Sequence, residues 1–535
     1  MIIMKKSLLC IILVFIFFSN TSIDAQNSSG GKVDPFDAEQ KLNQGNFEGA
    51  LEDYLNLLYS DPKNDNYNYA IAICYLNSNI NKAKAIPYLE IITRKTKFDP
   101  NALYLLARAY HYSYRFDDAI KSFTTFKQNA RGNVDNLNDV DRQIQYCINA
   151  KELLKFPINV TFENLGANVN TPYADYYPFV PNDESFIILN SRKPEEGSEK
   201  VREDGSYSAS VYISKENNGN FSKAKRFESP IIKKDGEQEV IGLSGSGDVM
   251  LFYYTNFKGV GDIYISPNEK GKASKIPEKL SENINSSAEE IAACLNHDGS
   301  ILYFASNRSG GFGGTDLYMS ILLPNGTWGP AQNLGPAINT VFNEDFPNIT
   351  SDGKTLYFSS NGHTSMGGYD IFKAEKDPVT KNFENPKNIG YPINTPQDDY
   401  NFRMAGNGRF GYMASLREGG LGDLDIYRVT INEVEAQYSA VIGSILSADT
   451  TKKIQYSDVF ITVNDATTHE IIGTYLPNPN SGRYIIILSP GLFEVTIEAN
   501  GFKTIAEKIN ILGKSSYKFE IQKDIKLYPD GYPTK

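Results

Sequence analysis

The feature that most constrains the fold is a repeat of about 54 residues in the middle of the chain. The segment DGSILYFASN, beginning at Asp298, returns as DGKTLYFSSN at Asp352. A second short strand follows each copy, and its aspartate recurs at positions 262, 316, 370 and 425, with spacings of 54, 54 and 55. One small sheet cannot bury both of its faces alone. A fixed period near 50 residues with several short strands per unit therefore predicts a β-propeller.

Five copies of this unit fit between residues 157 and 431, and six is the alternative count. Their second strands begin at Phe186, Leu251, Leu302, Leu356 and Phe410. An outermost strand follows the earlier units, but the chain leaves the pattern at Ile431 without one. A matching segment, Ile158–Leu165, instead precedes the first unit. We expect this N-terminal strand to complete the last blade, because closing the ring in this way removes an exposed sheet edge.

Residues 34–156 carry a different period and predict a helical domain. Alanines recur at 38, 72 and 107 and again at 50, 85 and 119, with spacings of 34 or 35. The second series is followed at a fixed distance by Tyr54, Leu89 and Phe123, as expected where paired helices cross. This pattern resembles the tetratricopeptide repeat. The resemblance implies three repeats with a capping helix, and a concave groove that binds a partner. The side chains implied to face this groove are those of Tyr69, Tyr104, Arg108 and His111. Ordinary packing between repeats is the alternative role for these side chains.

The C-terminal residues 436–525 alternate as short strands separated by polar turns, which predicts a small antiparallel β-sandwich. Residues 526–535 are expected to form a tail. The strand SGRY at Ser481, the turn Pro490-Gly491 and the bend ANGF at Ala499 are similar to those of the carboxypeptidase regulatory-like family. That resemblance implies an accessory module without catalytic groups. The expected fold is therefore multidomain: an all-α solenoid, a five-bladed propeller and a β-sandwich.

The N-terminus and the composition limit the possible partners. Lys5 and Lys6 precede a short apolar run, Leu8–Phe18, so residues 1–25 are expected to be a signal peptide cleaved near Ala25. The formal net charge of −11 argues against nucleic acid as a partner. The remaining cysteines, Cys74, Cys147 and Cys294, are too few for a disulfide scaffold. We expect these cysteines to be buried as small apolar residues. A disulfide between Cys74 and Cys147 is the alternative for that pair.

Acidic residues precede the first strand of every propeller unit and are the candidate site in the ring. First strands line the axial channel, so these residues predict a carboxylate ring at one mouth: Asp175, Glu239, Glu290, Asp345 and Asp399. Five-bladed glycosidases use axial carboxylates as acid and base, which makes glycan binding or hydrolysis the alternative function. Catalysis needs carboxylates in distinct environments, however, and repetition in every unit favours a structural turn. The four scattered histidines support neither a metal site nor a catalytic triad, so no enzyme, metal or cofactor is expected.

The propeller unit resembles the WD40-like, TolB-type (PD40) repeat through its Asp-Gly turn, its LYFSSN strand and its glycine-rich hairpin. The order of signal peptide, tetratricopeptide repeats, propeller and regulatory-like module resembles the PorE-like family of the type IX secretion and gliding apparatus of the Bacteroidota. The resemblance implies a non-enzymatic periplasmic scaffold bound to an outer-membrane protein of the PorP/SprF type. PorE-like proteins continue into an OmpA-like domain that binds peptidoglycan. This sequence ends at Lys535, where that domain would begin, so peptidoglycan binding is not expected.

Overall fold

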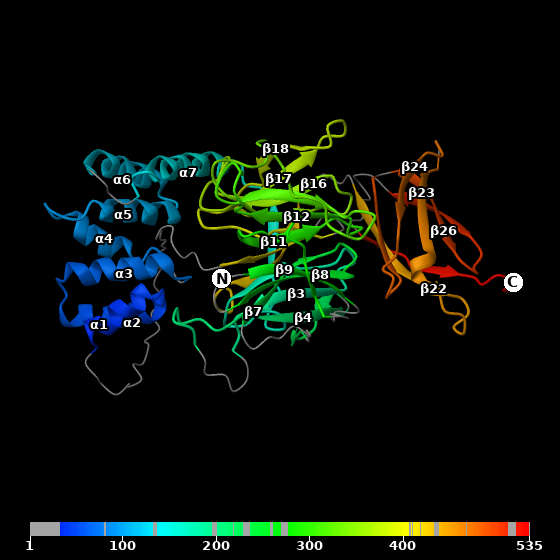
Figure 1. Cartoon of the computed structure of the whole chain (residues 1–535), viewed down its shortest axis with the longest axis horizontal. Helices are drawn as coiled ribbons and strands as arrows, with labels where there is room; N and C mark the ends of the chain where they lie inside the picture. Colours follow the sequence, from blue (N-terminus) through cyan, green and yellow to red (C-terminus); the bar gives the residue numbers. More distant parts are fainter. Residues whose placement is uncertain are drawn as a thin grey trace.

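The computed structural model describes three regions in a row: a helical domain, a ring of β-sheets and a smaller β-module at the C-terminal end (Figure 1). It describes residues 33–533 except for short segments at 80–81, 132–135, 195–200, 218, 228–235, 257–260, 269–275, 406–407, 409, 418, 433–437, 467, 490 and 512–519. The predicted signal peptide lies outside the described residues. A multidomain chain with an N-terminal helical domain followed by a β-propeller is thereby confirmed.

Seven described helices form the N-terminal domain, and consecutive helices pack against one another. Their bounds are α1 Pro35–Asn43, α2 Phe47–Ser60, α3 Asp65–Asn77, α4 Ile86–Thr93, α5 Asn101–Tyr112, α6 Phe116–Asn129 and α7 Val140–Leu153. All six alanines of the predicted periodic series are completely buried. The small side chains therefore lie where helices cross, as the spacing predicted, and Phe123 fills the adjoining space with 0% exposure.

The described residues of the ring form five sheets of short antiparallel strands, which matches the predicted number of blades. The first sheet holds β2 Asp175–Phe179, β3 Phe186–Ser191, β4 Ser210–Asn217, β5 Asn220–Phe221 and β6 Lys225–Arg226. The second holds β7 Gly236–Leu243, β8 Val249–Asn256, β9 Gly261–Pro267 and β10 Glu278–Lys279. The third holds β11 Glu290–Leu295, β12 Ile301–Ser306, β13 Asp316–Ile321 and β14 Gln332–Asn333. The fourth holds β15 Glu344–Ile349, β16 Thr355–Ser360, β17 Asp370–Lys376 and β18 Phe383–Asn388.

The fifth sheet closes the ring with a strand from the other end of the propeller sequence. It holds β19 Arg403–Met404, β20 Phe410–Ser415, β21 Asp425–Ile431 and, beside β21, the N-terminal strand β1 Val160–Asn164. The two strands pair antiparallel, with Val160 opposite Ile431 and Asn164 opposite Tyr427. The predicted closure is confirmed, and the sheet edge that β21 would otherwise expose is covered.

A repeated side-chain network explains why the aspartate spacing is so regular. In the third sheet, Asn333 donates to Asp316 (2.7 Å) and accepts from Asn339 (2.8 Å), which also bonds both backbone groups of Leu317. The same network recurs in the fourth sheet through Asp370, Asn388 and Asn394, and in the fifth through Asp425, Asn164 and Asn170. In the fifth sheet this network joins the two ends of the propeller sequence. The strand β1 therefore makes the same side-chain hydrogen bonds as the fourth strand of another blade, and it occupies the same position in the sheet.

In the described part of the C-terminal module, two four-stranded sheets surround one apolar core. Its strands are β22 Ser439–Ser447, β23 Val459–Asp465, β24 Ile471–Tyr475, β25 Arg483–Leu488, β26 Gly491–Ala499, β27 Ile505–Ile511, β28 Glu520–Gln522 and β29 Ile525–Leu527. The predicted boundary at 525 is corrected, because β29 pairs parallel with β22 and Leu527 is fully buried. Contacts with the propeller include an ion pair between Arg483 and Glu216 (3.2 Å).

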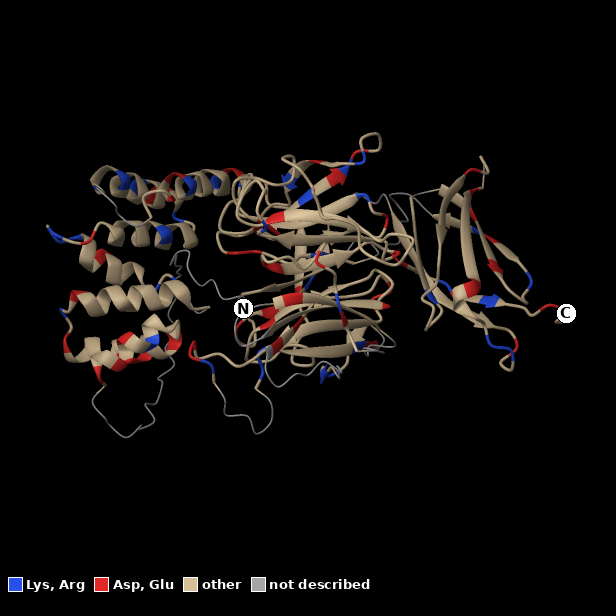
Figure 2. Cartoon of the chain, viewed as in Figure 1, with Lys and Arg blue, Asp and Glu red and all other residues tan. Residues whose placement is uncertain are grey.

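Charged residues are distributed over the whole molecule. Basic and acidic residues are interspersed along all three regions (Figure 2). Cys74, Cys147 and Cys294 are buried and unbonded, and burial raises the pKa of Cys74 to about 12. Within the described ranges, no helix is both long and apolar enough to cross a membrane.

Candidate functional site

The helical domain is fixed to the ring through α7, which contacts the loop between β16 and β17. The Arg142 guanidinium donates to the carbonyl oxygens of Asn361 and His363. Further along the helix, Tyr146 donates to the Asn361 carbonyl (2.6 Å) and Asn149 donates to the Ser365 carbonyl (2.8 Å). Since a helix repeats every 3.6 residues, the spacing of 142, 146 and 149 puts these donors on one face.

The apex of the same loop inserts into the helical domain. Met366 has 0% exposure and belongs to the apolar core of the helices rather than to that of the propeller. The imidazole of His111, at the end of α5, donates from Nε2 to the Met366 carbonyl (2.8 Å). Burial and, to a smaller extent, the positive charge of Arg108 lower the pKa of His111 to about 3, so this imidazole is neutral at physiological pH.

These contacts correct the interpretation of the predicted groove residues. Tyr104 is fully buried among Phe123 and Phe126, and its hydroxyl donates to Asp139 (2.5 Å). Arg108 and His111 are 6% and 1% exposed, respectively. Tyr69 is half-buried against the helical core. The propeller loop covers His111, whereas Tyr104 and Arg108 are buried by side chains of the helical domain itself, as the alternative of packing between repeats predicted. None of the three is open to a partner as the groove prediction required.

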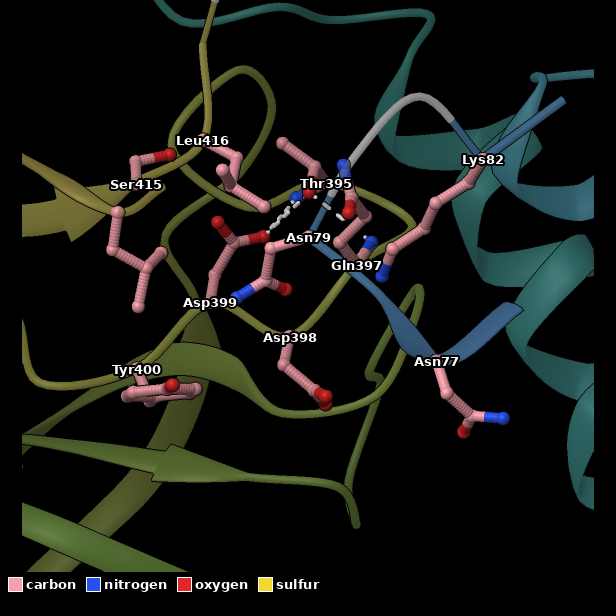
Figure 3. A pocket seen from close by; sticks show the side chains of 11 residues that line it. Asn77, Asn79, Lys82, Thr395, Gln397, Asp398, Asp399, Tyr400, Ser415 and Leu416 are labelled. Atoms are coloured by element: carbon pink, nitrogen blue, oxygen red, sulfur yellow. Dashed lines mark hydrogen bonds between the residues drawn. The ribbon is translucent and has the colours of Figure 1, made fainter. Parts of the chain in front are cut away.

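A polar cavity of about 150 Å³ lies where α3 meets the fifth sheet (Figure 3). The helical domain contributes Asn77, Asn79 and Lys82. The ring contributes residues from the loop before β19, from the end of β20 and from the position before β21: Thr395, Gln397, Asp398, Asp399, Tyr400, Ser415, Leu416 and Leu424. Its carboxylates, amides and hydroxyls surround space for a few water molecules.

Two groups in this cavity titrate near neutral pH. Burial lowers the pKa of Lys82 to about 7, and the carboxylates of Asp398 and Asp423 oppose that shift. Burial raises the pKa of Asp399 to about 7, against the opposing effect of Arg417. Asp399 is already engaged, because its Oδ2 accepts from the backbone N–H and the hydroxyl of Thr395 (2.5 and 2.8 Å). The cavity therefore combines a buried amine with a buried carboxyl at the junction of two domains.

The predicted carboxylate ring is instead a set of turn-stabilising groups. Asp175 and Glu290 lie directly opposite Ser191 and Ser306 in their sheets, and each carboxylate accepts from the backbone and hydroxyl of the Ser or Thr four residues earlier. Asp399 makes the same pair of bonds with Thr395. The structural reading of the repeat therefore accounts for these three residues.

The other two predicted ring members occupy different positions. In the fourth sheet the equivalent carboxylate is Glu344, opposite Ser360, whereas Asp345 accepts the N–H of Phe346 (2.7 Å). In the second sheet Glu237 lies opposite Thr255, and Glu239 instead accepts from the Tyr176 hydroxyl. The predicted ring of five equivalent groups is thus wrong at Asp345 and Glu239, by one and two residues respectively.

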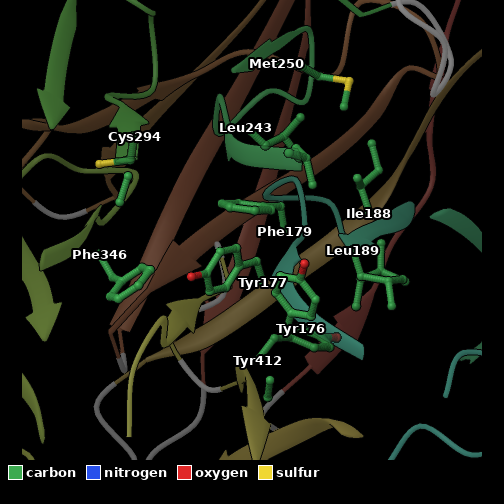
Figure 4. Close-up of a cluster of buried hydrophobic side chains, with 14 of the residues drawn as sticks. Tyr176, Tyr177, Phe179, Ile188, Leu189, Leu243, Met250, Cys294, Phe346 and Tyr412 are labelled. Atoms are coloured by element: carbon green, nitrogen blue, oxygen red, sulfur yellow. The ribbon is translucent and has the colours of Figure 1, made fainter. Parts of the chain in front are cut away.

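Aromatic side chains of two first strands, Tyr177 of β2 and Phe346 of β15, lie among the buried hydrophobic side chains of the ring (Figure 4). Tyr177 and Phe346 each lie two residues after a turn carboxylate, and both have positive φ values, 52° and 50°. Such bulges re-aim side chains. The ring centroids of Phe346 and Tyr400 are 5.1 Å apart, and those of Tyr177 and Phe346 are 5.2 Å apart. Burial raises the pKa of Asp345 beside this cluster to about 7.

Sequence reasoning missed the junction residues Arg142, Tyr146, Asn149 and Met366. The spacing of the three polar residues at i, i+4 and i+7 was a detectable signal, although it does not identify the surface they contact. Among the described residues, no cluster of three or more His, Cys, Asp or Glu side chains is placed to hold a metal ion.

Comparisons with known proteins find similarity only at the level of solved structures. No family model and no curated protein matches the sequence. TolB from Acinetobacter baumannii matches with a TM-score of 0.30 and 15% identity over 48% of this chain and 55% of that one, so the match spans about half of TolB. An α-L-arabinanase from Penicillium chrysogenum matches with a TM-score of 0.31 and 12% identity, covering 51% and 99%. A GH43 enzyme from Xanthomonas citri matches with a TM-score of 0.32 and 10% identity, covering 52% and 92%. The assignment of a propeller rests on the sheets of this chain, not on these scores.

Proposed function

We propose that this protein is a non-enzymatic periplasmic scaffold that associates with an outer-membrane protein of the PorP/SprF type in a secretion or gliding machinery. In this proposal the helices are tetratricopeptide repeats, the ring is a PD40-type propeller and the C-terminal module is carboxypeptidase regulatory-like. This order of domains along the chain is the feature in which the protein resembles PorE-like proteins.

The set of contacts that joins the helical domain to the ring is the observation that supports the proposal. Three side chains of α7 bind loop carbonyls, and Met366 is buried inside the neighbouring domain. Such a junction fixes the distance and angle between two binding platforms, which a scaffold requires. The equivalent carboxylates at the ring mouth are held by their own turns, so their repetition has a structural explanation that needs no catalysis.

Purification of the tagged full-length protein from detergent-solubilised envelopes of its native cell tests the proposal. We expect co-purification of an outer-membrane β-barrel protein that is absent from a tag-only control. Recovery of the protein without any membrane partner would contradict the scaffold role.

Glycan binding or hydrolysis is the second candidate function, and the residues that line the junction cavity are the observation that supports it. Asp398 and Asp399 lie beside Tyr400 in that cavity, so carboxylates and an aromatic ring share one wall. A volume of about 150 Å³ is below the 300–1,000 Å³ typical of ligand pockets, which places this candidate second. Glycan-array binding or glycosidase activity that is lost in Asp398→Asn would support it, and a negative result in both assays would remove it.

A further inference from the structure

Two neighbouring blades carry the same loop in two different environments. The β12–β13 loop and the β16–β17 loop differ by the repeat offset of 54 residues. In each, the strand aspartate accepts the backbone N–H of the apex residue: Asp316 from Phe312 (2.7 Å) and Asp370 from Met366 (2.9 Å). The two apex side chains therefore project from equivalent, rigidly held backbone positions.

The loop with Met366 shows what such a loop binds. Its apex lies in an apolar space between helices, and its carbonyls at Asn361 and Ser365 accept bonds from one face of α7. The combination is specific: an apolar recess for the apex and polar donors at i, i+4 and i+7 for the backbone. A helix can satisfy both requirements at once because its side chains repeat on one face.

The equivalent loop in the third blade is bare. Phe312 is 47% exposed, where Met366 has 0% exposure, and all residues from 309 to 314 are exposed. Asn307 and Gly311 are the counterparts of Asn361 and Ser365, so their carbonyls have the positions that α7 uses in the next blade. The exposed apolar surface also includes Val341, which is 75% exposed.

This bare loop is continuous with the established junction. Phe342 adjoins Val341 in the chain, and its ring lies 4.4 Å from the Arg142 guanidinium of α7. A helix placed on the third blade would therefore lie beside α7 and extend the helical layer that already covers the fourth blade. The polar face of this chain's own α7 is occupied by its own loop, which excludes α7 of a second copy as the occupant.

We propose that the 307–314 loop, together with Val341, is a docking site for an amphipathic α-helix of a partner protein. The helix encloses Phe312 in apolar side chains and donates hydrogen bonds to the carbonyls of Asn307 and Gly311. The inference deepens the scaffold function proposed above and rests on it for the existence of a partner, because it adds the structural class of the bound element.

A helical probe tests the site directly on the full-length protein. The probe is a fluorescein-labelled peptide of residues 137–156, held helical by a hydrocarbon staple on the face opposite Arg142 and Tyr146. We expect saturable binding by fluorescence anisotropy and a loss of at least about tenfold in affinity with Phe312→Asp, because a central aromatic anchor is removed. Val379→Asp is the matched control, since Val379 is an exposed apolar residue in a turn of another loop (84%) and should leave binding unchanged.

The polar half of the proposal has its own test. The stapled peptide carrying Arg142→Ala and Tyr146→Ala should bind several-fold more weakly than the unmodified peptide. Absence of saturable binding, or equal affinity for the wild-type protein and Phe312→Asp with unchanged circular dichroism, would overturn the site.

The two proposals fail in distinguishable ways. If the stapled peptide does not bind but the wild-type protein still co-purifies with a membrane protein, the helix site is wrong and the scaffold function stands. If the peptide binds at Phe312 but no membrane partner is recovered, the helix site stands and the outer-membrane scaffold is wrong.

Discussion

Substitution of Asn164 by alanine tests whether the strand that closes the ring is bound like the fourth strand of an ordinary blade. The Asn164 amide donates to Asp425 (2.7 Å) and accepts from Asn170 and from the backbone N–H of Gly166 (both 2.8 Å). The bond to the carboxylate contributes about 1.5–3 kcal/mol and each neutral bond about 1 kcal/mol. Asn164 is only half-buried, so water replaces part of this loss. We therefore expect a loss of about 3 kcal/mol in the free energy of unfolding.

The third blade offers a matched control, and the sequence offers a probe. Asn333 makes the same three bonds at 2.7, 2.8 and 2.8 Å within a single repeat, so Asn333→Ala should cost a similar amount. The single tryptophan, Trp328, is 6% exposed and lies in the ring, so its fluorescence during urea denaturation reports unfolding of the propeller. A loss of less than about 1 kcal/mol for Asn164→Ala, beside about 3 kcal/mol for Asn333→Ala, would refute the equivalence of the closing strand.

Three further outcomes are expected. A chain that starts at Gly166 should melt at a lower temperature than one that starts at Phe156, because it lacks β1 and exposes the edge of β21; equal melting temperatures by calorimetry would argue against the closure. Met366→Asp should release the helical domain, since a charge cannot remain in an apolar recess, and small-angle scattering should show a larger radius of gyration that Val379→Asp does not produce. The pKa of Asp399 is about 7 in the folded state, above its unfolded value of about 4, so the native state holds a proton that the unfolded state has released, and stability should fall as pH rises from about 4 to 7. Asp399→Asn should flatten that fall in urea titrations at several pH values, and an unchanged slope would exclude this carboxyl as a source.

The repeat spacing predicted most of the ring because each repeated residue has a local task. The aspartates at 316, 370 and 425 accept the N–H of the residue four positions earlier in three successive blades, so their spacing records the blade length directly. The closing strand was also predictable, because the last unit lacked an outermost strand and a matching segment, Ile158–Leu165, preceded the first unit. The blade boundaries follow from these two observations alone.

The candidate site was less predictable, because its residues depend on bulges and on contacts between domains. Asp345 and Glu239 were assigned to the carboxylate ring, although bulges interrupt the register of both first strands. In the fourth sheet the Thr four residues before Glu344 was a better signal, whereas no Ser or Thr precedes Glu237 at that distance. For Tyr104, Arg108 and His111, the helical period gives the face on which a side chain lies. It carries no information about which other domain covers that face, and Met366 lies more than 250 residues away from His111 in the chain.

The antiparallel pairing of β1 and β21 also determines how the ring responds to mechanical load. The chain enters the propeller at Val160 and leaves it at Ile431, and these two residues lie opposite each other. Once the contacts of α7 and Met366 with the ring are lost, tension between the helical domain and the C-terminal module separates the two strands from this end, one hydrogen-bonded pair after another. Rupture in this geometry needs less force than sliding the strands past each other. The hydrogen bonds among Asp425, Asn164 and Asn170 lie at the other end of this strand pair, so they would be the last to break before the ring opens.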